Sequence, residues 1–131
     1  MRYITLNQAV FIHDKMIEKI GGSSGHNETM IGYLSSALDS IKNDLYYPNL
    51  EDKIAHLVHS CVKFHPFNDG NKRTAILLAD MFLSANDITL DDEKFYEAME
   101  DVVVKVATNE LTKENLKEIL GKFIKEYALN N

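Results

Sequence analysis

The sequence is poor in cysteine, proline and long apolar runs, and each scarcity narrows the class of protein. Its one cysteine, Cys61, has no partner for an internal disulfide, which favours a reducing, cytoplasmic setting. The two prolines both fall where helices are expected to start or stop. Apolar runs are only a few residues long, and no cleavage-site pattern follows Met1. We therefore expect neither a membrane span nor a signal peptide.

Positive charge is also scarce. Lys and Arg number 14 against 20 Asp and Glu, so the formal net charge is −6. A negative surface repels phosphate backbones, which argues against general nucleic-acid binding. Hydrophobic residues make up 45% and charged residues 26%, the mixture of an ordinary globular protein. With 131 residues and no linker or repeat, the chain is expected to form one domain over 1–131.

Apolar residues recur at helical spacing through most of the chain. The pattern predicts an all-α, compact single-domain bundle of about six helices, with at most a short extended segment over 88–90. The expected helices cover about 7–20, 28–45, a third from a cap at Asn49 to a stop at Pro66, 71–85, 92–107, and a last from a cap at Thr112 through Tyr127.

Several local signals place these boundaries. Gly21 begins a glycine-rich loop over 21–25 that ends the first helix. Asn49 and Asp52 have the spacing of a capping box. Apolar residues cover most of the circumference of the helix over 71–85, so we expect it to be central.

Chemistry-bearing residues concentrate between the third and fourth predicted helices, in the stretch 63–74. A turn between two buried helices needs one glycine and one capping residue, and this stretch holds many more polar groups. A helix that starts near Asn71 directs its unpaired N–H groups toward the turn, and Gly70 lets a ligand approach the backbone. Lys72 and Arg73 are unfavourable in a first helical turn unless an anion such as a nucleotide phosphate neutralises them.

Two further residues suggest a reaction. Asp69 offers a hard oxygen ligand for Mg²⁺ that bridges phosphates. His65 offers an imidazole, the side-chain type that accepts a proton from a hydroxyl near neutral pH. Each residue alone also has a structural explanation, as a helix cap, a solvated cation or a turn histidine. The ordered set favours a site for phosphoryl or nucleotidyl transfer.

The segment from His65 to Arg73 resembles the signature of the Fic/Doc superfamily, His-x-Phe-x-(Asp/Glu)-(Gly/Ala)-Asn-(Gly/Lys)-Arg, with every fixed position filled. Typical Fic enzymes, which transfer AMP, have glycine in place of Lys72 and a second arginine in place of Ile76. Both departures resemble the Doc branch, the "death on curing" toxins. The loop over 21–25 and the segments 47–50 and 82–86 are also similar to Doc sequences.

The resemblance implies a toxin that transfers the γ-phosphate of ATP, with Mg²⁺, to a protein serine or threonine, in the Doc branch a threonine of elongation factor Tu. It implies inhibition by a cognate antitoxin, docked in an apolar groove to which Phe11, Ile12, Ile31 or Tyr33 contribute. The implied roles are general base for His65, Mg²⁺ ligand for Asp69, anion hole for Gly70 and Asn71, phosphate binding for Lys72 and Arg73, nucleotide contact for Asn68, and a structural anchor for Phe67.

Alternative interpretations stay open at this stage. The chain could transfer AMP, as most of the superfamily does, or bind a partner without catalysis. His56 and His59 have a spacing that suits a metal, but the sequence offers no third ligand, and we interpret them as surface residues of the helix. Cys61 lies on an apolar stripe, which predicts a buried and unreactive thiol.

Overall fold

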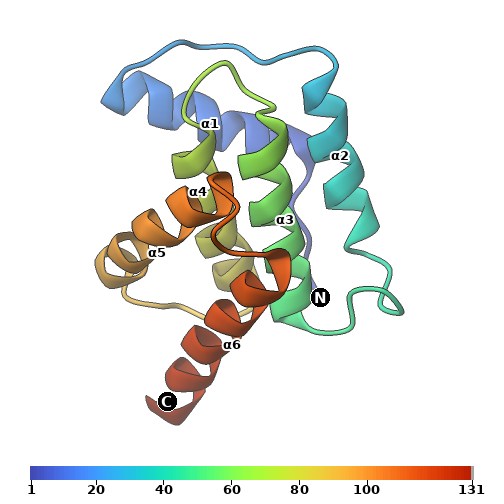
Figure 1. The fold of residues 1–131 in the computed structure, drawn as a ribbon, viewed down its shortest axis with the longest axis vertical. Helices are drawn as coiled ribbons and strands as arrows, with labels where there is room; N and C mark the ends of the chain where they lie inside the picture. The colour runs from blue at the N-terminus through green and yellow to red at the C-terminus, as the bar shows by residue number, and fades with distance from the viewer. Residues whose placement is uncertain (131) are drawn as a thin grey trace.

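The protein folds into a bundle of six α-helices, seen here in a computed structural model that describes residues 1–130 (Figure 1). Within that range there is no β-strand, and one isolated antiparallel bridge joins His26 to Phe67. The helices are α1 (Leu6–Ile20), α2 (Met30–Ser40), α3 (Leu50–Phe64), α4 (Asn71–Ala85), α5 (Asp92–Ala107) and α6 (Lys113–Asn130). The all-α prediction is therefore confirmed.

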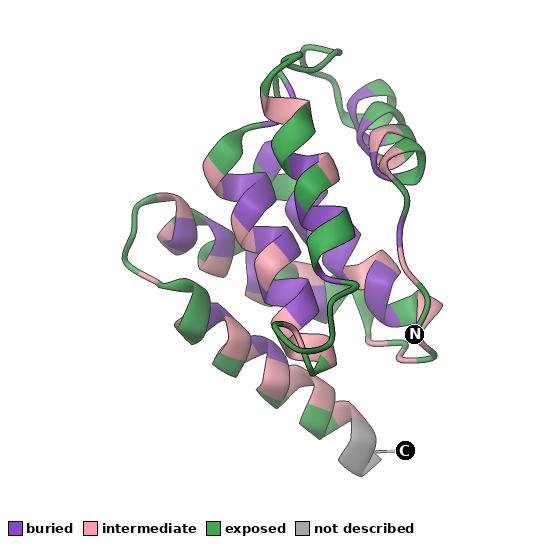
Figure 2. Ribbon diagram, turned by 90° about the vertical axis from the view of Figure 1, so that its right-hand side faces the viewer, coloured by how far each residue is buried: buried purple, intermediate pink, exposed green. Residues whose placement is uncertain are grey.

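The core is built around α3 and α4, which pack closely against each other. Eight of the 15 residues in each helix are buried, as predicted for α4. The other helices surround this pair: α1 runs crosswise at one end, α2 and α5 flank it, and α6 packs on α3 (Figure 1). Buried positions gather on the central helices, and exposed positions face outward (Figure 2).

Local sequence signals correctly predict several helix boundaries. The Asn49–Asp52 capping box forms at the start of α3. The Thr112 hydroxyl accepts the Asn115 backbone N–H at 3.1 Å, which caps α6. Gly21 follows α1 with a φ of 99°.

The second helix is shorter than the 28–45 predicted from periodicity. It begins at Met30 because the Asn27 side chain accepts the backbone N–H groups of Thr29 and Met30, both at 2.9 Å. It ends at Ser40 because the ammonium of Lys53, from α3, binds the Ile41 carbonyl oxygen at 2.5 Å and a carboxylate oxygen of Asp44 at 2.7 Å. The helix therefore ends at a tertiary contact that periodicity does not show.

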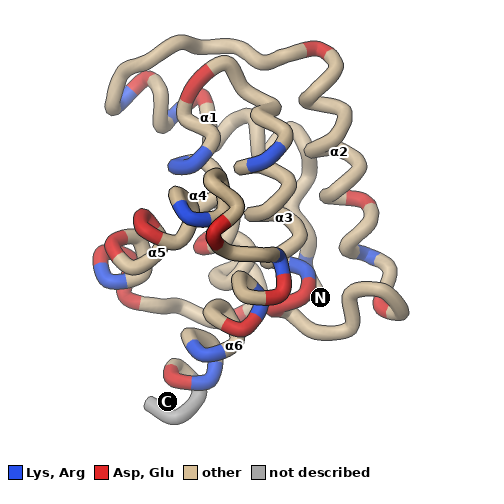
Figure 3. Tube along the Cα trace, in the orientation of Figure 1, with Lys and Arg blue, Asp and Glu red and all other residues tan. Residues whose placement is uncertain are grey.

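Acidic and basic positions are interspersed along α6, whereas α5 carries five acidic residues and two basic ones (Figure 3). In the described part of the chain, no helix combines the length and apolar character that a bilayer crossing requires.

Candidate active site

His65 lies in the connection between the two central helices, directly after α3. Its backbone is left-handed, with φ 49° and ψ 59°, and its side chain is exposed to solvent. Pro66 disfavours helical geometry at the preceding residue, which explains why α3 ends here. A non-glycine residue in the left-handed region stores strain, and such residues concentrate at functional sites. The fold thus presents the predicted base at the surface, on a fixed turn.

The N-terminus of α4 opens onto the same turn. Gly70 precedes the helix with a φ of 77° and no side chain caps it. The first backbone hydrogen bond of the helix runs from the Thr74 N–H to the Gly70 carbonyl oxygen at 2.9 Å. The N–H groups of the first turn are therefore available to an anion, with the positive end of the helix dipole behind them.

Two cations stand in that first turn. Lys72 and Arg73 are both exposed, and the first turn of α4 contains no acidic residue. Lys72 forms no ion pair with any residue in the described range. Arg73 lies near Tyr96 of α5, where burial raises the pKa of the phenol and the guanidinium opposes that rise. The turn thus gathers positive charge that the protein itself leaves largely unneutralised.

Asp69 is exposed and is held in place through both its side chain and its backbone. Its Oδ1 accepts the N–H of Gly70 at 2.8 Å, and its Oδ2 accepts the N–H of Ser23 from the glycine loop at 3.2 Å. Its own carbonyl oxygen lies 2.8 Å from Nε2 of His13 on α1. The carboxylate therefore has a defined direction before any ligand binds.

Asn71 holds the turn together from beneath. Its amide oxygen accepts the Phe67 N–H and its amide nitrogen donates to the Phe67 carbonyl oxygen, both at 3.0 Å. The same nitrogen lies 3.5 Å from Nδ1 of His65. Phe67 itself is buried in the core, which confirms its predicted anchoring role. The side chain of Asn71 thus serves the loop, and its predicted place in an anion hole stays a prediction.

The glycine loop packs directly on the turn. The Asn68 amide nitrogen donates to the Ser24 carbonyl oxygen at 3.0 Å, and its backbone N–H donates to the Gly25 carbonyl oxygen at 3.0 Å. A Cβ placed on Gly22 would lie 2.6 Å from Oδ2 of Asp69. The loop that the sequence placed after the first helix therefore forms one wall of the site, in backbone contact with it.

These residues enclose a cavity of about 490 Å³. All seven residues predicted for the site line it: His65, Asn68, Asp69, Gly70, Asn71, Lys72 and Arg73. Met16 and Ile17 of α1 and Gly21, which follows that helix, complete the lining. The structure thus brings together every predicted site residue. Their individual roles stay predictions.

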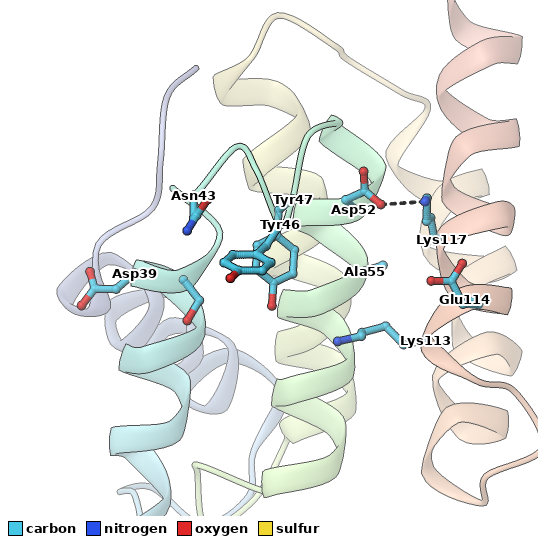
Figure 4. Close-up of a pocket in the computed structure, with 10 residues that line it drawn as sticks. Asp39, Asn43, Tyr46, Tyr47, Asp52, Ala55, Lys113, Glu114 and Lys117 are labelled. Atoms are coloured by element: carbon cyan, nitrogen blue, oxygen red, sulfur yellow. Dashed lines mark ion pairs between the residues drawn. The ribbon is translucent and has the colours of Figure 1, made fainter.

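A larger cavity, of about 710 Å³, lies elsewhere, between α2, the start of α3 and the start of α6 (Figure 4). Asp52 and Lys117 form an ion pair of 2.8 Å at its edge. Asp52 is about 20 Å from His65 along α3, at 1.5 Å per residue. Every predicted site residue lines the smaller cavity at the motif turn, and none of them lines this larger one.

Sequence reasoning missed His13. It gave this residue no role, yet the side chain is fully buried and touches the motif turn. A signal was available, because His13 falls on the same helical face as Ala9, Met16 and Ile17, which are all buried. A histidine on the inner face of a helix calls for a polar partner.

Cys61 is buried, as predicted, whereas His56 and His59, interpreted from the sequence as surface residues of the helix, are both half-buried. No group of three metal-binding side chains occurs among the described residues. Burial and the nearby Lys113 lower the pKa of His56 to about 4. Burial raises the pKa of the Cys61 thiol to about 12, so this cysteine is an inert core residue.

An apolar groove of about 450 Å³ runs between α1 and α4. Phe11 and Ile12, two of the four residues predicted for such a groove, line it with Met16, Ile20 and Leu77. Ile31 and Tyr33, on α2, do not line it. Phe11 and Ile20 are more than half exposed, so this face of α1 has no partner within the described chain.

Comparison with known proteins agrees with this geometry. The "Protein kinase doc" of Escherichia phage P1 is 27% identical over 125 residues, which cover 93% of this chain and 95% of that protein. The "Toxin Doc" of Mycolicibacterium smegmatis is 36% identical over 77 residues, 59% of either chain. Residues 3–83, more than half of the chain, match the model of the Fic/DOC family. Because that match contains every residue lining the cavity at the turn, the chain belongs to the Fic/DOC family.

Proposed function

We propose that the protein is a Doc-like toxin that transfers the γ-phosphate of ATP to a serine or threonine hydroxyl of a target protein. One observation carries the proposal: the exposed His65 borders the same cavity as the uncapped N-terminus of α4 and its two cations. A base beside a phosphate cradle is the minimum that such a transfer requires. The name "Protein kinase doc" of the P1 relative supports the kinase assignment.

The phosphates of the nucleotide would bind at the start of α4. Backbone N–H groups of the first turn donate to phosphate oxygens, and Lys72 and Arg73 supply neutralising charge. Typical AMP-transferring relatives have a second arginine at the position of Ile76. In this protein the position holds an uncharged side chain that is buried in the core. That position therefore contributes no charge to the cavity, which favours transfer of the terminal phosphate over transfer of AMP.

Asp69 fits a magnesium ion in this setting. Among the described residues it is the one carboxylate that lines the cavity, and Mg²⁺ in nucleotide sites is commonly held by one or two carboxylates together with substrate phosphates and water. Asp69 would hold the ion, which would neutralise charge on the phosphates. The fixed direction of the carboxylate suits this task.

His65 would take the proton in the transfer itself. The hydroxyl oxygen of the target attacks the γ-phosphorus while the bond from that phosphorus to the β–γ bridging oxygen breaks, and ADP leaves. The hydroxyl proton passes to an unprotonated nitrogen of the His65 imidazole. The exposure of His65 allows a protein substrate to reach it.

The target and the regulator follow from the Doc resemblance. We propose a threonine of elongation factor Tu as the acceptor, so that its phosphorylation stops translation. We propose also that a cognate antitoxin inhibits the toxin and covers the groove between α1 and α4 with an apolar helix.

Labelled ATP tests the proposed reaction. The protein is incubated with cell extract and ATP labelled at either the α or the γ position, and we expect label on a protein from the γ position alone. His65→Ala is expected to slow labelling about 100-fold or more. His59→Ala, on α3 shortly before His65 but outside the cavity, is the matched control and is expected to label normally. Label from the α position alone means AMP transfer, and no label from either means a non-catalytic protein.

A further inference from the structure

His13 of α1 is the one histidine that the fold buries completely. Burying an imidazole is costly unless its polar atoms find partners. Its Nε2 lies 2.8 Å from the carbonyl oxygen of Asp69, and its Nδ1 lies 3.1 Å from Oδ1 of Asp14. Its ring stacks on that of Phe67, with centroids 3.9 Å apart and planes inclined by 6°. The ring is therefore fixed on three sides.

Two of these contacts lie in the motif turn, on either side of Asn68. Phe67 meets the face of the ring, and Asp69 meets its edge. The other end of the contact is on α1, so the histidine joins a helix to a turn 56 positions away in the sequence. His13 therefore contacts the backbone of the turn at one peptide group, the one between Asp69 and Gly70.

That peptide group links His13 to the carboxylate of Asp69. A carbonyl oxygen only accepts hydrogen bonds, so the 2.8 Å contact requires a hydrogen on Nε2 of His13, whichever form Nδ1 takes toward the Asp14 carboxylate. The peptide bond between Asp69 and Gly70 is planar and trans, so its N–H points opposite to the carbonyl that His13 holds. This N–H donates to Oδ1 of Asp69 at 2.8 Å. Fixing the carbonyl therefore fixes the donor that orients the carboxylate.

We propose that His13 is a positioning residue that sets the direction of the Asp69 carboxylate through the Asp69–Gly70 peptide group, and so prepares Asp69 to hold a divalent cation. The part concerning the cation rests on the proposed function, whereas the part concerning the peptide group does not. Residues that orient a metal ligand without touching the metal typically change metal affinity 10–100-fold when they are replaced.

Two substitutions separate positioning from packing. His13→Phe keeps an aromatic ring that can stack on Phe67 but removes the donor. His13→Gln keeps a donor at nearly the position of Nε2 and removes the ring. If His13 positions the peptide group, His13→Phe disturbs the Gly70 amide and weakens Mg²⁺ binding, whereas His13→Gln stays close to the parent in both. If His13 only fills space, the order is reversed.

The first readout needs no nucleotide. The backbone amide of Gly70 is followed by ¹H–¹⁵N NMR, and we expect its resonance to move in His13→Phe and to stay near that of the parent in His13→Gln. In the parent, the ring ¹⁵N shifts of His13 are expected to show hydrogen on Nε2. A ring with hydrogen on Nδ1 alone, or an unmoved Gly70 amide in His13→Phe, overturns the proposal. The ring measurement holds even if a variant does not fold.

The second readout is binding of Mg²⁺ with a non-hydrolysable ATP analogue, measured by calorimetry. The Mg²⁺ concentration for half-saturation is expected to rise about 10-fold or more in His13→Phe and far less in His13→Gln. An unchanged Mg²⁺ requirement in His13→Phe contradicts the positioning role. A parent protein that binds no nucleotide contradicts the proposed function instead, and the Gly70 amide then decides the role of His13 on its own.

Discussion

Gly70 shows how tightly the turn is packed at the level of single residues. Its φ of 77° lies in the region that side chains rarely adopt. A Cβ at this position would lie 2.5 Å from Cε of Met16, which lines the same cavity. A glycine here lets the chain turn into α4 and lets α1 approach the turn closely.

Gly70→Ala is therefore expected to destabilise the protein and weaken nucleotide binding together. The left-handed backbone costs an alanine about 1–2 kcal/mol, and Met16 must move aside. Urea unfolding measures the first effect and calorimetry the second. Gly32→Ala is the matched control, since a Cβ at Gly32 of α2 meets nothing within 4 Å. It is expected to leave binding unchanged and to stabilise by about 0.5–1 kcal/mol. Equal losses in both variants contradict this account.

Residue by residue, the sequence predicted the members of the site better than their contacts. The motif from His65 to Arg73 places its residues side by side, so adjacency in the chain already brought them into one turn. His13 was invisible to that reasoning because its partner is 56 residues away. The contacts of Asn71 with the Phe67 backbone were missed for a related reason, because a ligand-binding and a loop-holding asparagine look alike in a sequence.

Among the helices, the accuracy of the predicted boundaries follows the source of the signal. The starts of α3 and α6 are set by capping residues within four positions, and both were predicted correctly. The end of α2 is set by Lys53 from another helix, and the prediction ran into the following turn. Local chemistry can be read along the chain, whereas tertiary capping cannot.

Lys53→Met is expected to cost about 2 kcal/mol of unfolding free energy. Methionine preserves the aliphatic packing of this buried side chain but leaves the carbonyl oxygen of Ile41, a fully buried residue, without its partner. Asp44 is mostly exposed and returns to water. Urea denaturation measures the change. Lys105→Met, which breaks an exposed pair with Asp101 within α5, is the control and is expected to cost less than about 0.5 kcal/mol. A similar small loss in Lys53→Met means that the carbonyl is satisfied in another way.

For the whole molecule, two side chains outside the site are expected to shape the dependence of stability on pH in opposite directions. Burial lowers the pKa of His56 from 6.5 to about 4, so the unfolded chain takes up a proton that the folded protein refuses. Burial and the nearby Asp92 raise the pKa of Asp80 from 3.8 to about 6, so the folded protein holds a proton that the unfolded chain releases. One oxygen of Asp80 is buried without a hydrogen-bond partner, which agrees with that burial.

The signs follow from proton linkage. Stability from His56 is complete above pH 6.5 and is lost as the pH falls toward 4. The unfavourable term from Asp80 is complete above about pH 6 and disappears as the pH falls toward 3.8. Both groups are partly open to solvent, so each term is on the order of 1 kcal/mol rather than the larger value that the full pKa shift implies. The two slopes share a window and partly cancel in the parent protein.

Replacing either group should therefore reveal the pH dependence of stability that the other group contributes. Asp80→Asn is expected to stabilise the protein at pH 7 and to make its stability fall more steeply than the parent's between pH 6.5 and 4, because the His56 slope is left uncompensated. His56→Phe is expected to make that fall shallower than the parent's, while His59, whose pKa burial also lowers, keeps a slope of the original sign. Urea unfolding at half-unit steps of pH measures both curves. Asp44, whose pKa lies below 3.8, changes charge outside the window and does not disturb the comparison. Parallel curves for the two variants contradict the assignment of opposite slopes.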